Sequence, residues 1–396
     1  MNVYVTGIGM ISALGPDVAT ALESLRQTRS GLGPIRHVAT RLQGCYVAGE
    51  VSFSDNELAT RANLPDADLT RTTLLGYLAA EEAWRGAGLG LGDTARTGFI
   101  SASTVGGTGH AEHYYQAFRD QQPTPAFIDT YDNADSTEFI SRRLGICDVV
   151  TTINTACASS ANAIVLGMRL IRQGVLDRVV VGGTDALARF TLNGFNSLLL
   201  LDPVPCKPFD AGRKGINLGE GAAYLVLESE AVARQRGARL WARLSGYGVA
   251  NDAFHQTGSS PTGRGLQLAM RQALDRAQLA PAAIGYLNAH GTGTANNDLT
   301  EGQAIRAVFG EAVPPFSSTK PFTGHALGAA GSIEAVLSVL ALTHGLIWPN
   351  LNFEQPIPEH GLVPAQVLRA APELAHVLST SAAMGGSCCA LLFSQP

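Results

Sequence analysis

A single cysteine, Cys157, stands among small residues in the stretch NTACASS (154–160), where a strand-like run gives way to a helical one. The preceding β-branched residues predict a buried strand, and the following SSANAIVLGMRLIRQG predicts a helix that closes at Gly174. Cys157 would therefore lie on a tight turn at the positive end of a helix. Unpaired N–H groups there stabilise an anion and make a thiol more acidic. The pattern indicates a nucleophile, although a small buried cysteine would fit the same residues.

Two histidines stand at similar junctions later in the chain. His290 ends a strand-like run in YLNAHGTGTANNDLTEGQAI, and His325 follows Lys320 in SSTKPFTGHALGAAGSIEA. Ligands gather where strands of α/β folds end. Each histidine alone would serve equally well as a structural residue, but two histidines and a cysteine at three such junctions form a better catalytic set.

The elements that must position these residues alternate along the whole chain. Short apolar runs such as VYVTGIG, TGFISAS, RVVVGGT, AAYLVLE and CCALLFS predict strands, and the segments between them predict helices. Such alternation is typical of an α/β fold in which both faces of the sheet are covered. The best internal division lies near residue 235, which predicts halves of 1–235 and 236–396, without a convincing sequence repeat between them.

Composition excludes several classes of protein. The 396 residues are 45% hydrophobic and 15% charged, and the formal net charge of −5 argues against nucleic acid as a partner. The six cysteines have neither disulfide nor zinc spacing. The sequence predicts neither a signal peptide nor a run long enough to cross a bilayer. We therefore expect no membrane insertion and a cytoplasmic location.

The three motifs together resemble one family. NTACASS, NAHGTGTANND with Glu301, and STKPFTGHALGAAGSIEA look like the signatures of elongating β-ketoacyl-acyl-carrier-protein synthases, the Cys-His-His type of the thiolase superfamily. The resemblance runs almost end to end, through the opening VYVTGIGMISALG, the central KPFDAGRKGINLGEGAAYLVLE and the closing MGGSCCALLF. It implies a thiolase fold with five layers, α-β-α-β-α, built from two similar halves.

The resemblance also assigns residues to roles. Cys157 matches the acyl-accepting nucleophile, and His290 and His325 match the two active-site histidines. Lys320, Glu301 and Glu334 match residues that support the site through hydrogen bonds. Thr292 and Thr294 match threonines that contact the pantetheine arm.

The implied reaction is a decarboxylative condensation of an acyl chain held on Cys157 with malonyl-acyl carrier protein. It gives a 3-oxoacyl-acyl carrier protein in fatty acid, polyene or polyketide biosynthesis. Backbone N–H groups of Cys157 and the Met384 turn would hold the oxyanion, and two imidazole N–H groups would hold the enolate. The substrates would be carried on the phosphopantetheine of acyl carrier protein, and we expect the reaction to need no metal or redox cofactor.

The substrate pocket departs from the family pattern. The family has an aromatic residue in a GFGGTN-like turn, whereas this chain has SAAMGGSCC, with Met384 in the aromatic place and Gly385 after it. Val105 matches the far end of the acyl tunnel, and Phe195 matches a wall residue. Core packing would explain these side chains equally well.

The expected partners are an acyl carrier protein and a second ketosynthase-like subunit. Arg71, Lys207 and Arg213 match carrier contacts, although ordinary surface charges would look the same. The assembly would be a homodimer or a heterodimer with a chain-length-factor-like subunit, of which this chain would be the catalytic member. A coenzyme A-dependent thiolase and a starter-type synthase are less favoured, since the first needs a second cysteine as a base and the second has Asn in place of His325.

Overall fold

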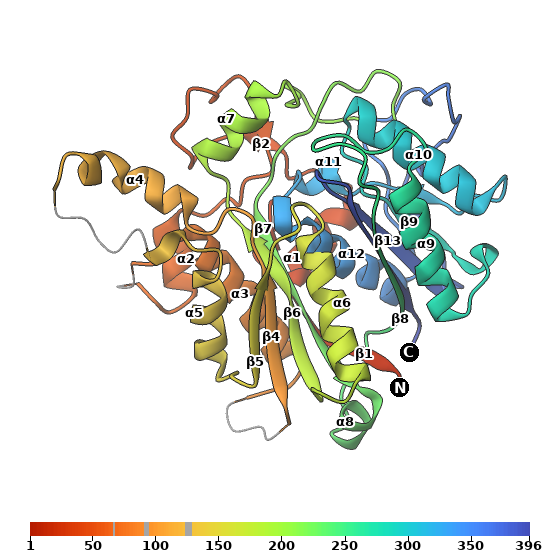
Figure 1. Cartoon of the computed structure of the whole chain (residues 1–396), viewed down its shortest axis with the longest axis horizontal. Helices are drawn as coiled ribbons and strands as arrows, with labels where there is room; N and C mark the ends of the chain where they lie inside the picture. Colours follow the sequence, from red (N-terminus) through yellow and green to blue (C-terminus); the bar gives the residue numbers. More distant parts are fainter. Residues whose placement is uncertain (66–67, 91–94, 123–128) are drawn as a thin grey trace.

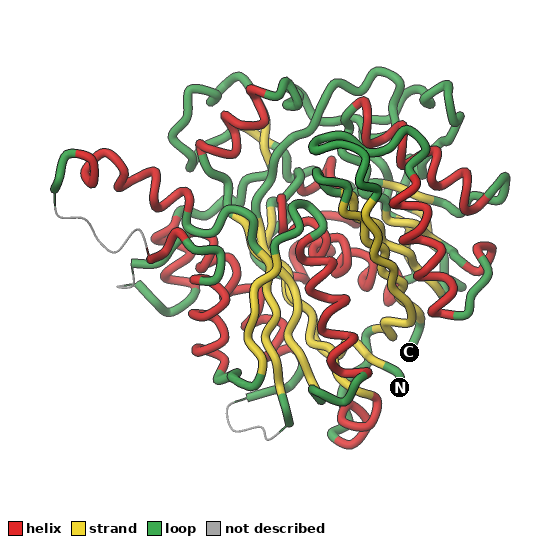
Figure 2. The backbone as a smooth tube through the Cα atoms, viewed as in Figure 1, coloured by secondary structure: helices red, strands yellow, loops and turns green. Residues whose placement is uncertain are grey.

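The computed structural model describes residues 1–65, 68–90, 95–122 and 129–396. Ten strands form one hydrogen-bonded sheet in the order β10-β9-β13-β14-β8-β1-β7-β6-β4-β5. Among the described residues, its two sides are joined between β1 and β8 by two residue pairs, Tyr4 with Arg243 and Val5 with Ala242. The strands accordingly fall into two groups of five, which Figures 1 and 2 show on either side of a central helical region.

The first group comprises β1 (Val3–Ser12), β4 (Thr97–Ala102), β5 (Val149–Ile153), β6 (Arg178–Asp185) and β7 (Gly221–Ser229). The second comprises β8 (Ala242–Asn251), β9 (Tyr286–Asn288), β10 (Phe316–Ser317), β13 (His376–Ala382) and β14 (Ser387–Ser394). When the strands of each group are numbered along the chain, both groups have the same spatial order, first, fifth, fourth, second, third. The two halves therefore share a strand topology although their sequences show no convincing repeat.

Helices complete five layers. The two central helices, α6 (Ser159–Arg172) and α12 (Ala330–His344), contact each other and strands of both groups. The outer faces are covered by α3 (Arg71–Gly86) with α5 (Asp135–Leu144) on the first group and α9 (Arg264–Ala277) with α10 (Ala295–Phe309) on the second. This arrangement confirms the α-β-α-β-α prediction.

Strands buried on both faces explain the continuous apolar runs. In β7, Ala223, Leu225 and Leu227 belong to the central core, whereas the alternate residues Ala222, Tyr224 and Val226 belong to the outer core beneath α3. Cys388 and Cys389 of β14 likewise belong to two different cores.

Eight of the ten strands of the main sheet coincide with strand-like runs in the sequence, whereas β8 and β13 were not predicted. The sequence ARLSGYGVAN of β8 contains two glycines that lie directly against the backbone of α9. The sequence HVLSTSA of β13 is interrupted by Ser and Thr that belong to the functional site or the buried core. Close packing and polar function thus remove the apolar signal.

The expectation that no run in the chain is long enough to cross a bilayer is corrected by the structure. The segment Leu327–His344 is long and apolar enough to span a bilayer, but 89% of it is buried inside the protein. It is the central core helix α12 with the short turn before it. Its apolar character is explained by contact with both groups of strands.

Glycine at position 331 allows the two central helices to approach. A Cβ atom there would lie 2.8 Å from the Cβ of Ala161, which belongs to α6. We expect Gly331→Ala to lower the free energy of unfolding by about 1–3 kcal/mol, because the helices must separate. Chemical denaturation followed by circular dichroism measures this change.

The matched control is Gly194→Ala in α7 (Arg189–Ser197), where nothing lies within 4 Å of the added Cβ. This variant should be as stable as the parent or gain about 0.5–1 kcal/mol. Equal stability of the two variants would contradict tight packing at Gly331.

Candidate active site

Cys157 lies on a strained turn between β5 and α6. Ala156, which precedes it, has φ 51°, a left-handed conformation that costs energy for any residue with a Cβ. The turn is held by the hydroxyl of Ser159, which accepts a hydrogen bond from the Thr155 N–H (2.8 Å) and donates one to the Ala156 carbonyl (2.5 Å). Cys157 is followed by the N-cap residue Ala158. The prediction of a cysteine at a helix N-terminus is confirmed.

The acidity predicted for the thiol is not. Burial raises the pKa of Cys157 to about 11, and the negative charge of Asp185 acts in the same direction. The Lys320 ammonium and the backbone N–H groups of Met384 and of Cys157 itself lower that pKa, but by less. Loss of water around the sulfur therefore outweighs the stabilisation that the turn offers to a thiolate.

Glu301 and Lys320 form hydrogen bonds with the backbone and the ring of His290. Its backbone N–H donates to Glu301 Oε1 (2.9 Å), and the Lys320 Nζ lies 3.1 Å from its ring Nδ1 and 2.5 Å from its carbonyl oxygen. Because an ammonium group can only donate, Nδ1 accepts, and the proton of the neutral ring is assigned to Nε2.

His325 reaches the same tautomer through a different contact. The backbone N–H of Leu327 donates to its Nδ1 at 3.1 Å, so its ring proton is also assigned to Nε2. The two imidazoles meet edge to face, with ring centroids 5.2 Å apart and planes at 88°. Burial, and secondly the charge of Lys320, hold the pKa of both histidines well below 6.5. The site therefore contains two neutral rings that are hydrogen-bond donors at Nε2.

Lys320 is buried and forms an ion pair with Glu334 of α12. Burial raises the pKa of Glu334 to about 7, against the opposing charge of Lys320. Burial also raises the pKa of Glu301, although the Gly291 N–H and the Thr380 hydroxyl oppose that shift. The charge of Lys320 also lowers the pKa of Cys157 and of both histidines, so these groups share one electrostatic environment.

The loop after His290 is built around two glycines and a carboxylate. Gly291 has φ 39°, and a Cβ there would lie 2.5 Å from the Cβ of Ser318. Asp298 accepts hydrogen bonds from the N–H groups of Thr292 (3.0 Å) and Gly293 (3.1 Å). The glycines are thus explained by packing against this chain's own residues rather than by a substrate.

The two threonines of this loop contact each other. The hydroxyls of Thr292 and Thr294 lie 2.8 Å apart, and Thr292 is nearly fully buried. Their assignment to the pantetheine arm stays a prediction.

The substrate-pocket residues lie in two groups. Val105 is buried in a small apolar cluster that contains Leu187 and Leu327, and Phe195 packs against it. Met384 and Gly385 form the turn between β13 and β14. This turn is bound to a neighbouring loop, since the Gly385 N–H donates to the Gln256 carbonyl (2.8 Å) and the Asn251 side chain donates to the Gly385 carbonyl (2.9 Å).

The assignment of Arg71 to carrier docking is wrong. Its side chain is 10% exposed and forms a salt bridge with the fully buried Glu220, and it also binds Asp55. It donates further hydrogen bonds to the Val51 and Phe53 carbonyls. Arg71 therefore joins three segments inside the first half and has no free donor for a partner.

The other two basic residues lie nearer the surface. Lys207 pairs with Glu354, which is itself exposed. The guanidinium of Arg213 donates to the carbonyls of Asp210, Thr294 and Ala295. Docking of a carrier protein by Lys207 and Arg213 stays a prediction. Arg213 is hydrogen-bonded to the loop that follows His290.

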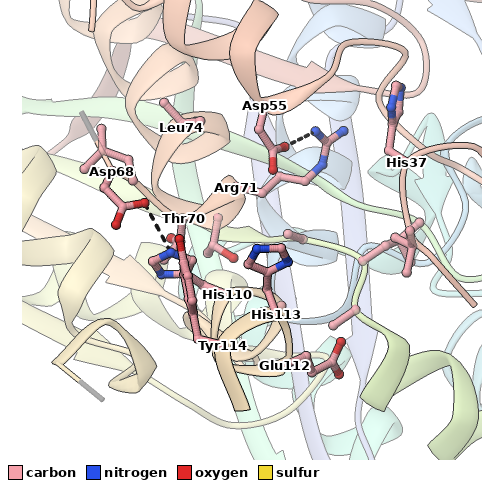
Figure 3. Close-up of a pocket in the computed structure, with 18 of the residues that line it drawn as sticks. His37, Asp55, Asp68, Thr70, Arg71, Leu74, His110, Glu112, His113 and Tyr114 are labelled. Carbon is pink, nitrogen blue, oxygen red and sulfur yellow. Dashed lines mark hydrogen bonds and ion pairs between the residues drawn. The ribbon is translucent and has the colours of Figure 1, made fainter. Parts of the chain in front are cut away.

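A cavity of about 960 Å³ lies elsewhere, between α3, α7 and α4 (Thr108–Arg119). Figure 3 shows His110 and His113 facing it, with His110 Nε2 3.3 Å from Asp68 Oδ1. Among the described residues that line it, none is a predicted catalytic residue. It begins next to Val105, however, because Gly106 and Gly107 are part of its wall.

Sequence reasoning missed two polar residues of the site. Thr380 accepts from the His290 N–H (3.2 Å) and donates to Glu301 Oε1 (2.9 Å), but it lies on β13, which was not predicted. Asp185 ends β6 and influences the thiol. An acidic residue at the end of the apolar run RVVVGGTD was a signal that could have identified it.

Comparison with known proteins agrees with this geometry. Residues 1–233 match the family described as "Beta-ketoacyl synthase, N-terminal domain", and residues 241–354 match "Beta-ketoacyl synthase, C-terminal domain". The fold and site thus define a thiolase-fold condensing enzyme. The chain belongs to the β-ketoacyl synthase family.

Two curated relatives are similar over their full length. The "3-oxoacyl-[acyl-carrier-protein] synthase 2" of Staphylococcus aureus (strain N315) is 34% identical over 412 residues, which cover 100% of this chain and 98% of the relative. The "Nodulation protein E" of Rhizobium meliloti (strain 1021) is 35% identical over 404 residues, which cover 100% and 99%.

Two solved structures are similar in fold and sequence. "The ishigamide ketosynthase/chain length factor" has a TM-score of 0.93 and 34% identity, with 100% of this chain and 99% of the other covered. "Ketosynthase (ApeO) in Complex with its Chain Length Factor (ApeC) from Xenorhabdus doucetiae" has a TM-score of 0.85 and 31% identity, with 100% and 98% covered.

The raised pKa of Cys157 makes a prediction about its reactivity. Iodoacetamide labels the thiolate, so labelling of Cys157 should rise about tenfold for each pH unit from 7 to 9 and should continue to rise above pH 9. Peptide mass spectrometry reads this residue separately, and exposed Cys45 supplies an internal reference. A labelling plateau reached below pH 8 would mean that the turn dominates over burial.

Proposed function

We propose that this chain catalyses the decarboxylative condensation of an acyl chain on Cys157 with malonyl-acyl carrier protein. The observation that carries the proposal is the pair of neutral imidazoles, His290 and His325, whose centroids are 5.2 Å apart and which both hold their proton at Nε2. Such a pair can donate hydrogen bonds to an oxyanion without first gaining a proton. Full-length similarity to a 3-oxoacyl-acyl carrier protein synthase supports the same reaction.

In the first step the Cys157 sulfur attacks the acyl thioester carbonyl. The N–H groups of Cys157 and Met384, which approach the sulfur, hold the negative oxygen, and the carrier's thiol leaves with the proton that the cysteine loses. Neither imidazole takes that proton in its assigned tautomer, because Nε2 already carries one. The transfer therefore exchanges one thioester for another.

In the second step the malonyl thioester loses carbon dioxide. The carbon–carbon bond electrons move into an enolate, whose oxygen accepts hydrogen bonds from Nε2 of His290 and His325. The enolate carbon then attacks the acyl-Cys157 ester, a carbon–carbon bond forms, and the cysteine sulfur leaves. The product is a 3-oxoacyl chain on the carrier, which makes the enzyme an acyltransferase of fatty acid or polyketide biosynthesis.

The substrate residues keep the roles that the resemblance gave them. Met384 and Gly385 would border the entrance, while Val105 and Phe195, which share one apolar cluster, would line the far end of the acyl pocket. A flexible thioether in place of an aromatic gate favours bulkier or stiffer acyl groups. Thr292 and Thr294 would contact the pantetheine arm.

A heterodimeric ketosynthase is the second candidate. Both structural neighbours described above are named as a ketosynthase with a chain length factor. In this chain β5 is at one end of the sheet, and its Val150 is 38% exposed, so a second sheet could continue there. We propose a two-subunit assembly in which this chain, with its cysteine and both histidines, is the catalytic member.

Further parts of the proposal concern the surroundings of the enzyme. Lys207 and Arg213 would contribute to docking of the acidic carrier protein. All six cysteines are unpaired, which fits a reducing cytoplasm. The two halves would be 1–235 and 236–396, with the nucleophile in the first and both histidines in the second.

The decisive experiment follows the acyl group. Intact-protein mass spectrometry after incubation with an acyl carrier should show an adduct on the parent protein and none on Cys157→Ala. The Cys45→Ala variant, which removes an exposed thiol, should form the adduct normally. The parent should also convert malonyl carrier and an acyl primer to a 3-oxoacyl product, and an adduct that persists in Cys157→Ala would refute the assignment.

The histidines should separate the two chemical steps. His290→Ala and His325→Ala should slow decarboxylation of malonyl carrier about a hundredfold, since each loses one donor, and should slow acyl transfer much less. His344→Ala at the end of α12 serves as the control. Because the pKa of both site histidines is low, decarboxylation should stay constant from pH 8 to pH 6. An equal loss of both steps would remove this division of roles.

A further inference from the structure

Asp185 is a fully buried carboxylate that accepts hydrogen bonds from four residues. It accepts hydrogen bonds from the Ser103 hydroxyl (2.7 Å), the Thr104 N–H (2.9 Å) and hydroxyl (2.6 Å), the Val105 N–H (3.2 Å) and the Gly328 N–H (2.6 Å). A buried charge is tolerated only with such compensation. Donors from separate segments of the chain therefore converge on the Asp185 carboxylate.

These donors come from both halves of the chain. Ser103, Thr104 and Val105 follow β4 in the first group, whereas Gly328 belongs to η3 (Leu327–Ala329), directly before α12. A Cβ at Gly328 would lie 2.8 Å from the Asp185 carboxylate and 2.9 Å from the Thr104 Cγ2. Only glycine fits this contact without displacing its neighbours.

Each segment held by Asp185 continues into the candidate site. On one side Val105 lies in the apolar cluster assigned to the far end of the acyl pocket. On the other side Leu327, which precedes Gly328, is the residue whose N–H fixes the tautomer of His325. One carboxylate thus connects the end of the pocket to a histidine of the reaction centre.

Asp185 also lies near the nucleophile's helix. A Cβ at Gly183, two residues earlier on β6, would lie 2.9 Å from the Cβ of Ser160. The charge of Asp185 raises the pKa of Cys157, and the charged group that opposes it there is Lys320, while His290 and His325 are neutral. The carboxylate is therefore part of the electrostatic environment of the thiol.

We propose that Asp185 is a positioning residue that couples the acyl-pocket turn at 103–105 to the loop that orients His325. Movement of the turn by a long or bulky acyl chain is transmitted through the carboxylate to Gly328 and Leu327. Chain length and donor geometry are then set together. The inference rests on the proposed function, because it assigns the pocket to the acyl chain.

Three variants test the proposal. Asp185→Asn removes the charge and replaces one acceptor oxygen with a donor that faces an N–H group. Gly328→Ala keeps the charge but displaces the contact. Glu82→Gln is the matched control, since Glu82 is a partly buried carboxylate that accepts from Met10 (2.8 Å) and Val18 (2.9 Å), away from the site.

Two readouts go beyond stability. Labelling of Cys157 by iodoacetamide at pH 8 should be about three- to tenfold faster in Asp185→Asn, because loss of the negative charge lowers the pKa of the thiol, and should be unchanged in Gly328→Ala. With malonyl carrier and primers of increasing length, both variants should give a product distribution shifted from that of the parent. Glu82→Gln should keep the parent's distribution and labelling rate.

The outcomes distinguish failure of the role of Asp185 from failure of the proposed function. Parental labelling in Asp185→Asn, or parental product lengths in Gly328→Ala, would overturn the role of Asp185 even if condensation is normal. The same product shift in Glu82→Gln would also overturn it. If Asp185→Asn does not fold, Gly328→Ala alone decides through product length. Absence of condensation by the parent with every primer would refute the proposed function, and the labelling experiment would still report whether Asp185 acts on Cys157.

Discussion

The ammonium group of Lys320 is the contact on which the site depends. It has three protons, and it meets three acceptors: Nδ1 of His290, the His290 carbonyl and the Glu334 carboxylate. A charge this deeply buried is stable only when all its donors are used. The same contacts place the His290 proton at Nε2, and the charge lowers the pKa of both histidines and of Cys157. Removal of Lys320 would therefore alter every reacting group at once.

The catalytic constellation was accessible from the sequence because its members stand at junctions between strands and helices. Cys157, His290 and His325 follow apolar runs, and the residue types around them are those of a known motif set. The structure brings both histidines into ring contact and places Lys320 between His290 and Glu334. Local patterns were sufficient here because a strand end fixes where the next side chains lie.

Properties that depend on residues far apart in the chain could not be predicted from local sequence patterns. Arg71 pairs with Glu220, 149 positions later in the chain, so its role inside the protein could not be recognised from its own neighbourhood. The pKa of Cys157 depends on how much water the surrounding core excludes, which no short motif records. The strand β13 was hidden because Thr380 supports the site instead of extending an apolar run.

The common strand order of the two halves places the candidate reacting groups at corresponding junctions. In each half the third strand leads through a short segment into the central helix: β5 leads through Cys157 to α6, and β10 leads through Lys320 and His325 to α12. The two helices that meet at Gly331 and Ala161 are thus topological counterparts. The corresponding junctions of the two halves carry different groups, the Cys157 thiol in the first half and the Lys320 ammonium and His325 imidazole in the second. The candidate reaction centre is therefore built where two halves with the same strand order meet within a single polypeptide.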